Sequence, residues 1–277
     1  MIAMHPSLLI TLSLLLLIAP FRSMCTDSSI ERRLARQLRT RSSPLTQKWY
    51  RDKQLHVSRA QKRAIQLHWS TVGIHLDFGR VLNLTTCFGR PFERYVLDIG
   101  FGSGESLVGM AQRHRSTGFL GCEIHRAGIG SALIKMHGDD SDPLENIRLI
   151  RSEVAVLLER HLAPACLDEI CVFFPDPWPN LERDGERRVI RASMLPLFER
   201  ALRSGGVVRV ATDVEDYALH TAAVFSDSGA SSRWQCLMSA KHEPCVGGPF
   251  DRPVTRYEER AKDLGNSVWD FRYRFMG

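Results

Sequence analysis

Hydrophobic and polar positions repeat in a regular way between residues 95 and 275, where short apolar runs precede longer segments with helical spacing. The apolar runs predict strands at residues 95–100, 118–124, 146–150, 168–174, 206–212 and 268–275. The segments between them predict helices at residues 105–114, 128–138, 154–161, 189–203 and 215–225. Strands that alternate with helices of this length are typical of an α/β fold with a mostly parallel sheet. The last run alternates apolar and polar residues, so we expect that strand near an edge of the sheet.

Acidic residues lie at or just after the ends of five successive predicted strands. They are Asp98, Glu123, Glu153, Asp176 and Asp213. One acid at such a position is most often a helix cap or a solvated loop residue. Parallel strands end at one edge of a sheet, and open α/β sheets bind ligands beyond that edge. Five acids in succession therefore predict a ligand site there.

The stretch "VFFPDPWPN" at residues 172–180 places one of these acids between prolines. Pro175, Pro177 and Pro179 by themselves would end a strand and shape the loop that follows. A rigid loop at a strand tip also suits a carboxylate that takes part in a reaction, and we expect Asp176 to be catalytic. Trp178 in the same loop is either a stacking platform or an ordinary core residue.

The turn "DIGFGSGES" after the first strand contains three alternating glycines, Gly100, Gly102 and Gly104. A dinucleotide fingerprint needs a glycine where Glu105 stands, and a phosphate-binding loop needs a lysine followed by Ser or Thr, so both are excluded. With Asp98 ahead of it, the turn fits S-adenosylmethionine, which has no phosphates and carries a cationic sulfonium. Glycines let the backbone approach such a ligand closely. Glu123, 21 residues after Gly102, is a candidate to bind the ribose hydroxyls.

Composition sets two further limits. The 277 residues are 44% hydrophobic and 25% charged, as in an ordinary globular protein, which excludes a chain dominated by disorder. The seven cysteines form no CxxC pair, and their positions predict neither a zinc site nor a disulfide framework. We therefore expect no metal.

Six stretches resemble the tRNA (guanine-N7)-methyltransferases of the bacterial type. They are "LDIGFGSGESL", "FLGCEIHRAGIGSAL", "FFPDPWP", "GGVVRVATDVEDY", "RPVTRYEERAKDLG" and "VWDF", and together they span about residues 95–275. The proline-flanked aspartate with its tryptophan, combined with the late "RPVTRYE" segment, is the specific part of the match. The resemblance implies a doubly wound, mostly parallel seven-stranded sheet, the Rossmann-like fold of class I methyltransferases, with S-adenosylmethionine as cofactor.

The resemblance also implies an activity, transfer of a methyl group to N7 of a guanine, position 46, in the tRNA variable loop. It implies a cofactor site made of Asp98, Gly100, Gly102, Gly104, Glu123, Glu153 and Asp176, with Asp176 between the cofactor and the base. It implies a substrate side made of Asn180, Asp213, Thr255, Arg256, Tyr257 and Glu258. Arg252 is a candidate phosphate contact. The expected partner is tRNA, with no obligatory protein subunit, and the expected state is a monomer or a weak homodimer.

The loop "PNLERDGERRV" departs from the family, in which this segment is strongly basic. Asn180 stands where the family usually has lysine, and Glu182, Asp184 and Glu186 add negative charge, which weakens contact with RNA phosphates. Two alternatives therefore stay open at this point. One is a methyltransferase that acts on another RNA or a small molecule, and the other is a non-catalytic RNA-binding relative.

The N-terminal region differs from the rest of the chain. An apolar run from Leu8 to Ile18 is short for a membrane span and fits a signal-peptide core. Residues 22–63 contain twelve Lys or Arg and three Asp or Glu, a net charge of +9, whereas residues 64–277 carry a net charge of −3. This basic arm is like a transit peptide, although it could also attract nucleic acid.

The order of signal and basic arm resembles the bipartite presequences of algal plastids bounded by extra membranes, and Phe21 after the apolar run fits that resemblance. We therefore expect an organelle with its own translation, a plastid of a complex alga or else a mitochondrion. Met24 as the true start is the alternative. The expected division is a signal-like segment at 1–21, a basic arm at 22–63 and a catalytic domain at 64–277, without stable membrane association after presequence removal.

Overall fold

The computed structural model describes residues 56–138, 144–227, 229, 232–242 and 252–277. The chain divides into two compact units, Met1–Gln47 and Lys48–Gly277, and every described residue belongs to the second. The expected signal-like segment and most of the basic arm lie outside the described residues. Their predicted boundaries, and the expected localisation, stay predictions.

The described residues form one eight-stranded mixed sheet with the order β1-β4-β3-β2-β5-β6-β8-β7. Neighbouring strands are parallel from β1 to β6, and β8 is antiparallel to both β6 and β7. The strands are β1 (Gly73–Ile74), β2 (Arg94–Ile99), β3 (Thr117–Cys122), β4 (Ile147–Ile150), β5 (Leu167–Phe173), β6 (Leu202–Thr212), β7 (Trp234–His242) and β8 (Val268–Phe275).

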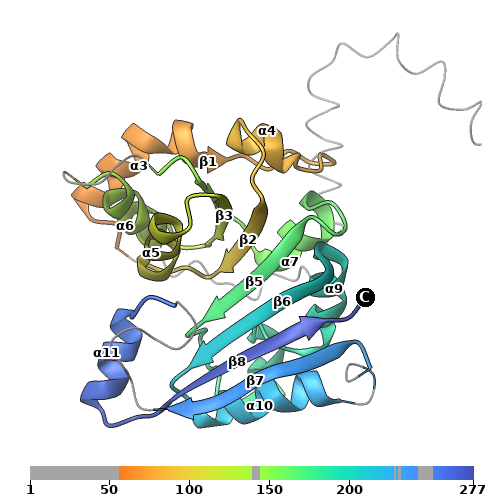
Figure 1. Cartoon of the computed structure of the whole chain (residues 1–277). Coiled ribbons are helices and arrows are strands. Elements are labelled where there is room, and N and C mark those ends of the chain that lie inside the picture. Colours follow the sequence, from red (N-terminus) through yellow and green to blue (C-terminus); the bar gives the residue numbers. More distant parts are fainter. Residues whose placement is uncertain (1–55, 139–143, 228, 230–231, 243–251) are drawn as a thin grey trace, which may run out of the picture. The chain divides into compact units, whose positions relative to one another are not determined.

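Helices connect these strands and cover the sheet. The α-helices are α3 (Arg59–Val72), α4 (Leu84–Phe88), α5 (Glu105–Arg113), α6 (Arg126–Met136), α7 (Val154–Val156), α8 (Leu181–Asp184), α9 (Leu195–Ala201), α10 (Glu215–Ser226) and α11 (Arg256–Asp263). The segments Leu157–His161, Gly185–Arg187 and Ala192–Met194 form a π-helix and two 3₁₀ turns. Helices α5 and α11 lie at the end of the sheet toward which β5 and β6 point (Figure 1).

The fold class predicted from the sequence is confirmed, and the six predicted strands correspond to β2, β3, β4, β5, β6 and β8. The expected count of seven is wrong by one in the described part of the chain, because the two-residue β1 pairs with β4. Strand β7 gave no signal because most of its side chains are exposed or half-buried, so it lacks an apolar run. The predicted helix at 189–203 begins later, at Leu195, with Pro196 in its first turn, where proline costs no hydrogen bond.

Helix α3 begins with a capping box. Ser58 accepts a hydrogen bond from the Gln61 backbone N–H at 3.2 Å, and the Gln61 side chain accepts one from the Ser58 backbone N–H at 2.8 Å. This capping box starts the helix at Arg59, so α3 includes residues 59–63 of the predicted basic arm, whose boundary stays a prediction. Among the helices described, none is long and apolar enough to cross a membrane.

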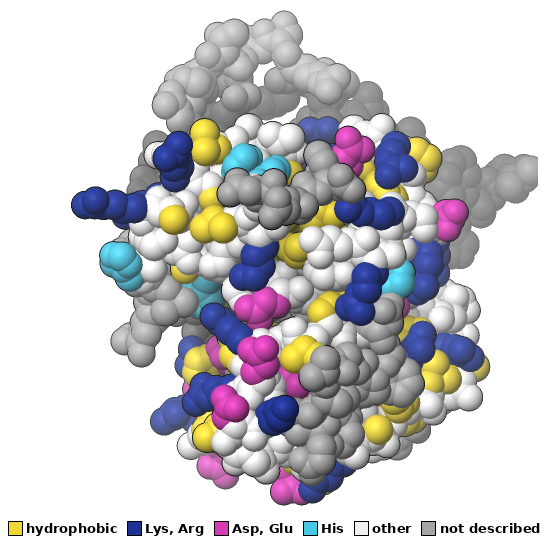
Figure 2. Space-filling view, turned by 60° about the vertical axis from the view of Figure 1, so that its left-hand side comes forward, with side chains coloured by type: hydrophobic (Ala, Val, Ile, Leu, Met, Phe, Trp, Pro, Cys, Tyr) yellow, Lys and Arg dark blue, Asp and Glu magenta, His cyan; other side chains and the backbone are white. Residues whose placement is uncertain are grey.

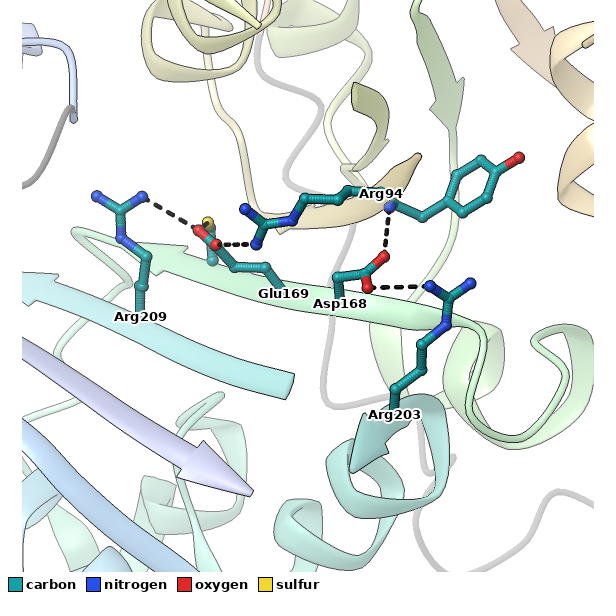
Figure 3. A network of polar contacts seen from close by, with 7 residues as sticks. Arg94, Asp168, Glu169, Arg203 and Arg209 are labelled. Atoms are coloured by element: carbon teal, nitrogen blue, oxygen red, sulfur yellow. Dashed lines mark hydrogen bonds and ion pairs between the residues drawn. The ribbon is translucent and has the colours of Figure 1, made fainter. Parts of the chain in front are cut away.

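Ion pairs and hydrogen bonds tie β2, β5 and β6 together (Figure 3). Glu169 on β5 pairs with Arg209 on β6 at 3.1 Å and with Arg94 on β2 at 3.3 Å. The adjacent Asp168 accepts hydrogen bonds from the Tyr95 backbone N–H at 2.7 Å and from Arg203 at 3.0 Å. These contacts fix the register of the three strands that carry the site.

The order of the strands places a crevice between β2 and β5. The chain moves outward from β2 through β3 to β4, then returns to place β5 on the other side of β2. Such a switch point leaves the carboxyl ends of the two central strands open to a ligand. Two pairs of residues lie at this position. They are Asp98 and Gly100 at the end of β2, and Phe173 and Phe174 at the end of β5.

Candidate active site

A pocket lies at this switch point. It is lined by Asp98, Gly100, Phe101, Ser103, Glu105, Ser106, Phe173, Phe174, Thr255 and Tyr257. Of the residues predicted from the sequence, it brings together Asp98 and Gly100 from the glycine turn with Thr255 and Tyr257 from the late segment. The segments are more than 150 residues apart in the sequence, and the fold alone makes them neighbours.

Asp98 is the buried carboxyl group of this pocket, with an exposed fraction of 1%. Burial raises its pKa to about 7, and the negative charge of Glu123 adds to the rise. Two contacts act in the opposite sense and lower the pKa of Asp98. They are a hydrogen bond from Ser106 Oγ at 3.5 Å and the positive charge of Arg209. A cationic ligand in the pocket would favour the ionised form.

Glu123 lies beside the glycine turn and organises it. Its Oε2 accepts a hydrogen bond from the Gly102 backbone N–H at 3.0 Å. Its Oε1 accepts hydrogen bonds from the backbone N–H groups of Ile124 at 2.7 Å and His125 at 2.9 Å. The carboxylate thereby joins the loops after β2 and β3, and its predicted contact with ribose stays a prediction. Gly104 is required by space as well as by its φ of +81°, since a Cβ there would lie 2.6 Å from Ala132 Cβ.

The late segment at residues 252–258 is anchored by a buried ion triad. Arg252 is fully buried and contacts Glu258 at 2.6 Å and Asp270 on β8 at 3.0 Å. Both partners are also buried, with exposed fractions of 1% and 4%. The prediction that Arg252 contacts phosphate is wrong, because RNA cannot reach it. The carboxylate of Glu258 is occupied by Arg252, so its predicted substrate contact stays a prediction.

Two side chains of the late segment face the pocket. Thr255 is 5% exposed, and its Oγ1 has no hydrogen-bond partner among the described residues. A buried hydroxyl without a partner is costly and is a natural contact for a ligand. The Tyr257 ring is stacked on Phe174, with centroids 5.9 Å apart, while Arg256 Nη2 donates to the Tyr257 hydroxyl at 3.2 Å.

The proline loop after β5 is held in an unfavourable backbone conformation. Phe174 and Trp178 have φ values of +50° and +39°, which residues other than glycine rarely adopt. Arg188, fully buried, donates to the Trp178 carbonyl from Nε at 3.3 Å and from Nη2 at 3.2 Å. Its Nη2 also contacts Asp216 at 2.6 Å. The Arg187 guanidinium lies 3.4 Å from the centroid of the Trp178 ring.

Two acidic residues of the following loop are paired with arginines. Asp184 contacts Arg183 at 2.7 Å and Arg187 at 3.4 Å, and the hydrogen bond from Arg183 lowers the pKa of Asp184. Glu186 contacts Arg191 at 3.3 Å. Asn180, predicted to bind substrate, caps α8 by accepting a hydrogen bond from the Arg183 backbone N–H at 3.0 Å.

The remaining predicted carboxylates lie at the same edge but outside the lining of the pocket. Asp176 in the proline loop is exposed, and Glu153 and Asp213 after β4 and β6 are half-buried. Sequence reasoning missed several lining residues, namely Phe101, Ser103, Glu105, Ser106, Phe173 and Phe174. Glu105 was visible only as the residue that breaks the dinucleotide pattern. The serines and phenylalanines gave no signal that distinguishes them from core or turn residues.

On the face that Figure 2 shows, Asp and Glu side chains gather near the middle, and Lys and Arg side chains lie around them. Asp98 and Glu105 in the lining of the pocket suit a cationic ligand, and the basic groups on this face suit a polyanion. The unpartnered Thr255 hydroxyl adds a contact for a hydroxyl or amino group. These residues fit S-adenosylmethionine, which carries a sulfonium, an ammonium and two ribose hydroxyls.

Solved structures show the same fold at low sequence identity. An antibiotic-related methyltransferase matches with a TM-score of 0.51 and 18% identity, over 73% of this chain and 96% of that one. A 16S rRNA methyltransferase matches with a TM-score of 0.50 and 18% identity, over 67% of this chain and 89% of that one. These matches show that the protein has the Rossmann-like fold of class I methyltransferases.

Sequence relatives narrow this class. A family model described as a putative methyltransferase matches residues 93–271. A tRNA (guanine-N(7)-)-methyltransferase of Nitrosococcus oceani is 39% identical over 215 residues, which cover 78% of this chain and 85% of that protein. One from Leifsonia xyli subsp. xyli is 39% identical over 216 residues, which cover 78% of this chain and 90% of that protein. The chain belongs to the tRNA (guanine-N7)-methyltransferase family.

Proposed function

We propose that this protein transfers the methyl group of S-adenosylmethionine to N7 of guanine 46 in the variable loop of tRNA. One observation carries the proposal: the pocket is lined on one side by the glycine turn and on the other by Thr255 and Tyr257. The family relatives named as tRNA (guanine-N(7)-)-methyltransferases support the same reaction. The expected monomer or weak homodimer, without an obligatory subunit, stays a prediction.

The chemistry needs orientation and negative charge rather than a base. N7 of guanine already carries a lone pair, so the chain's residues need not remove a proton before attack. S-adenosylmethionine, when bound, supplies a methyl group on a cationic sulfur. Positive charge then develops on the purine ring, and carboxylates can stabilise it as an oxyanion hole stabilises negative charge. We assign this role to Asp176, held by the proline loop, while the two walls of the pocket align the reacting atoms.

The test uses the full chain, radiolabelled S-adenosylmethionine and unmodified tRNA of the bacterial type. After incubation, the RNA is cleaved chemically at 7-methylguanosine. We expect one cut, in the variable loop at position 46. Label without this cut would refute the N7 assignment and favour another RNA position. The variant Asp176→Ala should lose methylation and keep RNA binding, whereas equal loss of both would give the loop a purely structural role.

For localisation, we propose that residues 1–63 direct the chain to an organelle with its own translation, a plastid or a mitochondrion. The support is the apolar run followed by the basic arm in the sequence. A reporter fused to residues 1–63 should enter such an organelle. A reporter that stays in the cytosol would contradict the proposal and favour Met24 as the start.

A further inference from the structure

Glu105 joins the two walls of the pocket. It is the first residue of α5 and lines the pocket. Its Oε1 accepts a hydrogen bond from Ser103 Oγ at 3.0 Å, and its Oε2 accepts one from the Arg256 backbone N–H at 3.0 Å. Ser103 belongs to the glycine turn, and Arg256 lies 151 residues further along the chain than Glu105. One carboxylate therefore contacts both the methyl-donor side and the substrate side.

The contact with Arg256 completes the start of α11. The first N–H groups of a helix have no partner within the helix. Thr255 is the N-cap of α11, but its side chain makes no capping hydrogen bond. The Glu105 carboxylate supplies the missing acceptor from another element, and its negative charge is favourable at a helix N-terminus. The position of this helix start therefore depends on Glu105.

The late segment is fixed to the fold on both sides of Thr255. On one side, Arg252 is paired with Asp270 on β8 at 3.0 Å. Pro253 packs closely on α5, since a Cβ on Gly109 would lie 2.9 Å from Pro253 Cγ. On the other side, the Arg256 backbone is bonded to Glu105. Thr255, with its unpartnered hydroxyl, lies between these anchors.

We infer that Glu105 is a positioning residue for methyl transfer, which holds Thr255 and Tyr257 against the methyl-donor side through the Arg256 backbone. It is not a catalytic residue, because it acts through another group. Lys135 lies 4.0 Å from Oε1 and is partly exposed, so it contributes little to this link. The inference rests on the proposed function, because methylation of tRNA is its readout.

The first test compares Glu105→Gln with Glu105→Met. Gln can keep both contacts, because its amide oxygen can accept from the Arg256 N–H while its NH₂ group donates to Ser103 Oγ. Glu105→Met removes both acceptors. We expect the KM for tRNA to rise about three- to tenfold in Glu105→Met and less in Glu105→Gln. The affinity for S-adenosylhomocysteine without RNA is measured in the same variants, so that a loss of cofactor binding is separated from a rise in the KM for tRNA. Lys135→Met keeps both hydrogen bonds of Glu105, and its KM for tRNA should stay within about twofold of wild type.

The second test removes the donor instead of the acceptor. Arg256→Pro removes the backbone N–H, and proline is well tolerated at the first position of a helix. Thr255 has a ψ of 161°, which suits the residue before a proline. Arg256→Ala loses the same side chain but keeps the N–H, so it is the matched control. We expect Arg256→Pro to have a KM for tRNA about three- to tenfold above that of Arg256→Ala.

Combining the variants isolates the bond between Glu105 and the Arg256 N–H. Glu105→Met should raise the KM for tRNA more in the Arg256→Ala background than in the Arg256→Pro background. Equal effects in both backgrounds would overturn the inference, as would equal KM values for Arg256→Pro and Arg256→Ala. The inference would also be overturned if the rise in KM disappeared once the variants were compared at the same concentration of folded protein. A wild-type chain that methylates no tRNA would refute the proposed function and this inference with it.

Discussion

At the scale of single residues, Asp98 depends on its environment for its chemistry. An exposed aspartate is fully ionised at neutral pH, but burial raises the pKa of Asp98 to about 7. The free chain therefore holds this carboxyl partly protonated near neutral pH. If the cationic methyl donor binds the ionised form, its affinity must follow this titration.

The first prediction concerns this pH dependence. The dissociation constant for S-adenosylmethionine, measured by calorimetry, should rise about tenfold from pH 8 to pH 6, because the ionised fraction of Asp98 falls. The pKa of Asp98 in the folded chain lies above that of an ordinary aspartate, so folding favours the protonated form. The free chain should therefore lose stability as the pH rises from about 4 to about 7. Asp98→Asn should bind S-adenosylmethionine more weakly than the wild type. In this variant neither the affinity nor the stability should change with pH in this range. A slope that persists in this variant would assign the titration to another group.

At the scale of elements, the proline loop needs support from outside itself. Its positive φ values at Phe174 and Trp178 are unfavourable and persist only where neighbouring structure enforces them. The carbonyl of Trp178 accepts two hydrogen bonds from Arg188, whose side chain is fully buried. This arginine therefore supports the loop that carries Asp176.

The second prediction tests this support. Arg188→Leu leaves the Trp178 carbonyl without its donors, so the free energy of unfolding should fall by about 1–3 kcal/mol. The kcat for tRNA methylation should fall at least about tenfold because Asp176 is no longer held in place. The affinity for S-adenosylhomocysteine should stay within about twofold. Arg183→Leu, which removes a 74% exposed side chain from the same region, should change the unfolding free energy by less than about 0.5 kcal/mol. Equal kcat values in wild type and Arg188→Leu would contradict this role.

At the scale of the whole molecule, the charges under the site also stabilise the sheet. Glu169 pairs with two arginines that differ in burial, since the Arg209 side chain is 13% exposed and that of Arg94 is 53% exposed. The two ion pairs are seen side by side in Figure 3. Removing one partner of a buried pair leaves an uncompensated charge, whereas an exposed pair contributes little.

The third prediction follows from this difference. Arg209→Met should lower the free energy of unfolding in urea by about 3–5 kcal/mol. Arg94→Met, which acts on the same carboxylate, should lower it by less than about 1 kcal/mol. The pKa of Asp98 should rise further in Arg209→Met, because Arg209 is one of the groups that lower it. Similar losses in the two variants would mean that burial does not decide the strength of these pairs.

The sequence by itself determined the order of strands and helices, because apolar runs with a period of two or 3.6 can be buried only as those elements. It also predicted the glycine turn as a cofactor loop. Space near α6 excludes a side chain at Gly104, as the structure shows. Strand β7 escaped prediction because exposed edge positions accept polar residues, so no apolar pattern is required there.

Only the tertiary structure decided which polar residues face a ligand and which face each other. Arg252, Glu258 and Arg188 look like surface charges in the sequence, but the fold places partners beside them and buries them. Glu105 acquired its contact with Arg256 because β2 and β8 belong to one sheet, which brings α5 beside α11. Pairing of charges depends on distances in space, and a sequence pattern describes only the order along the chain.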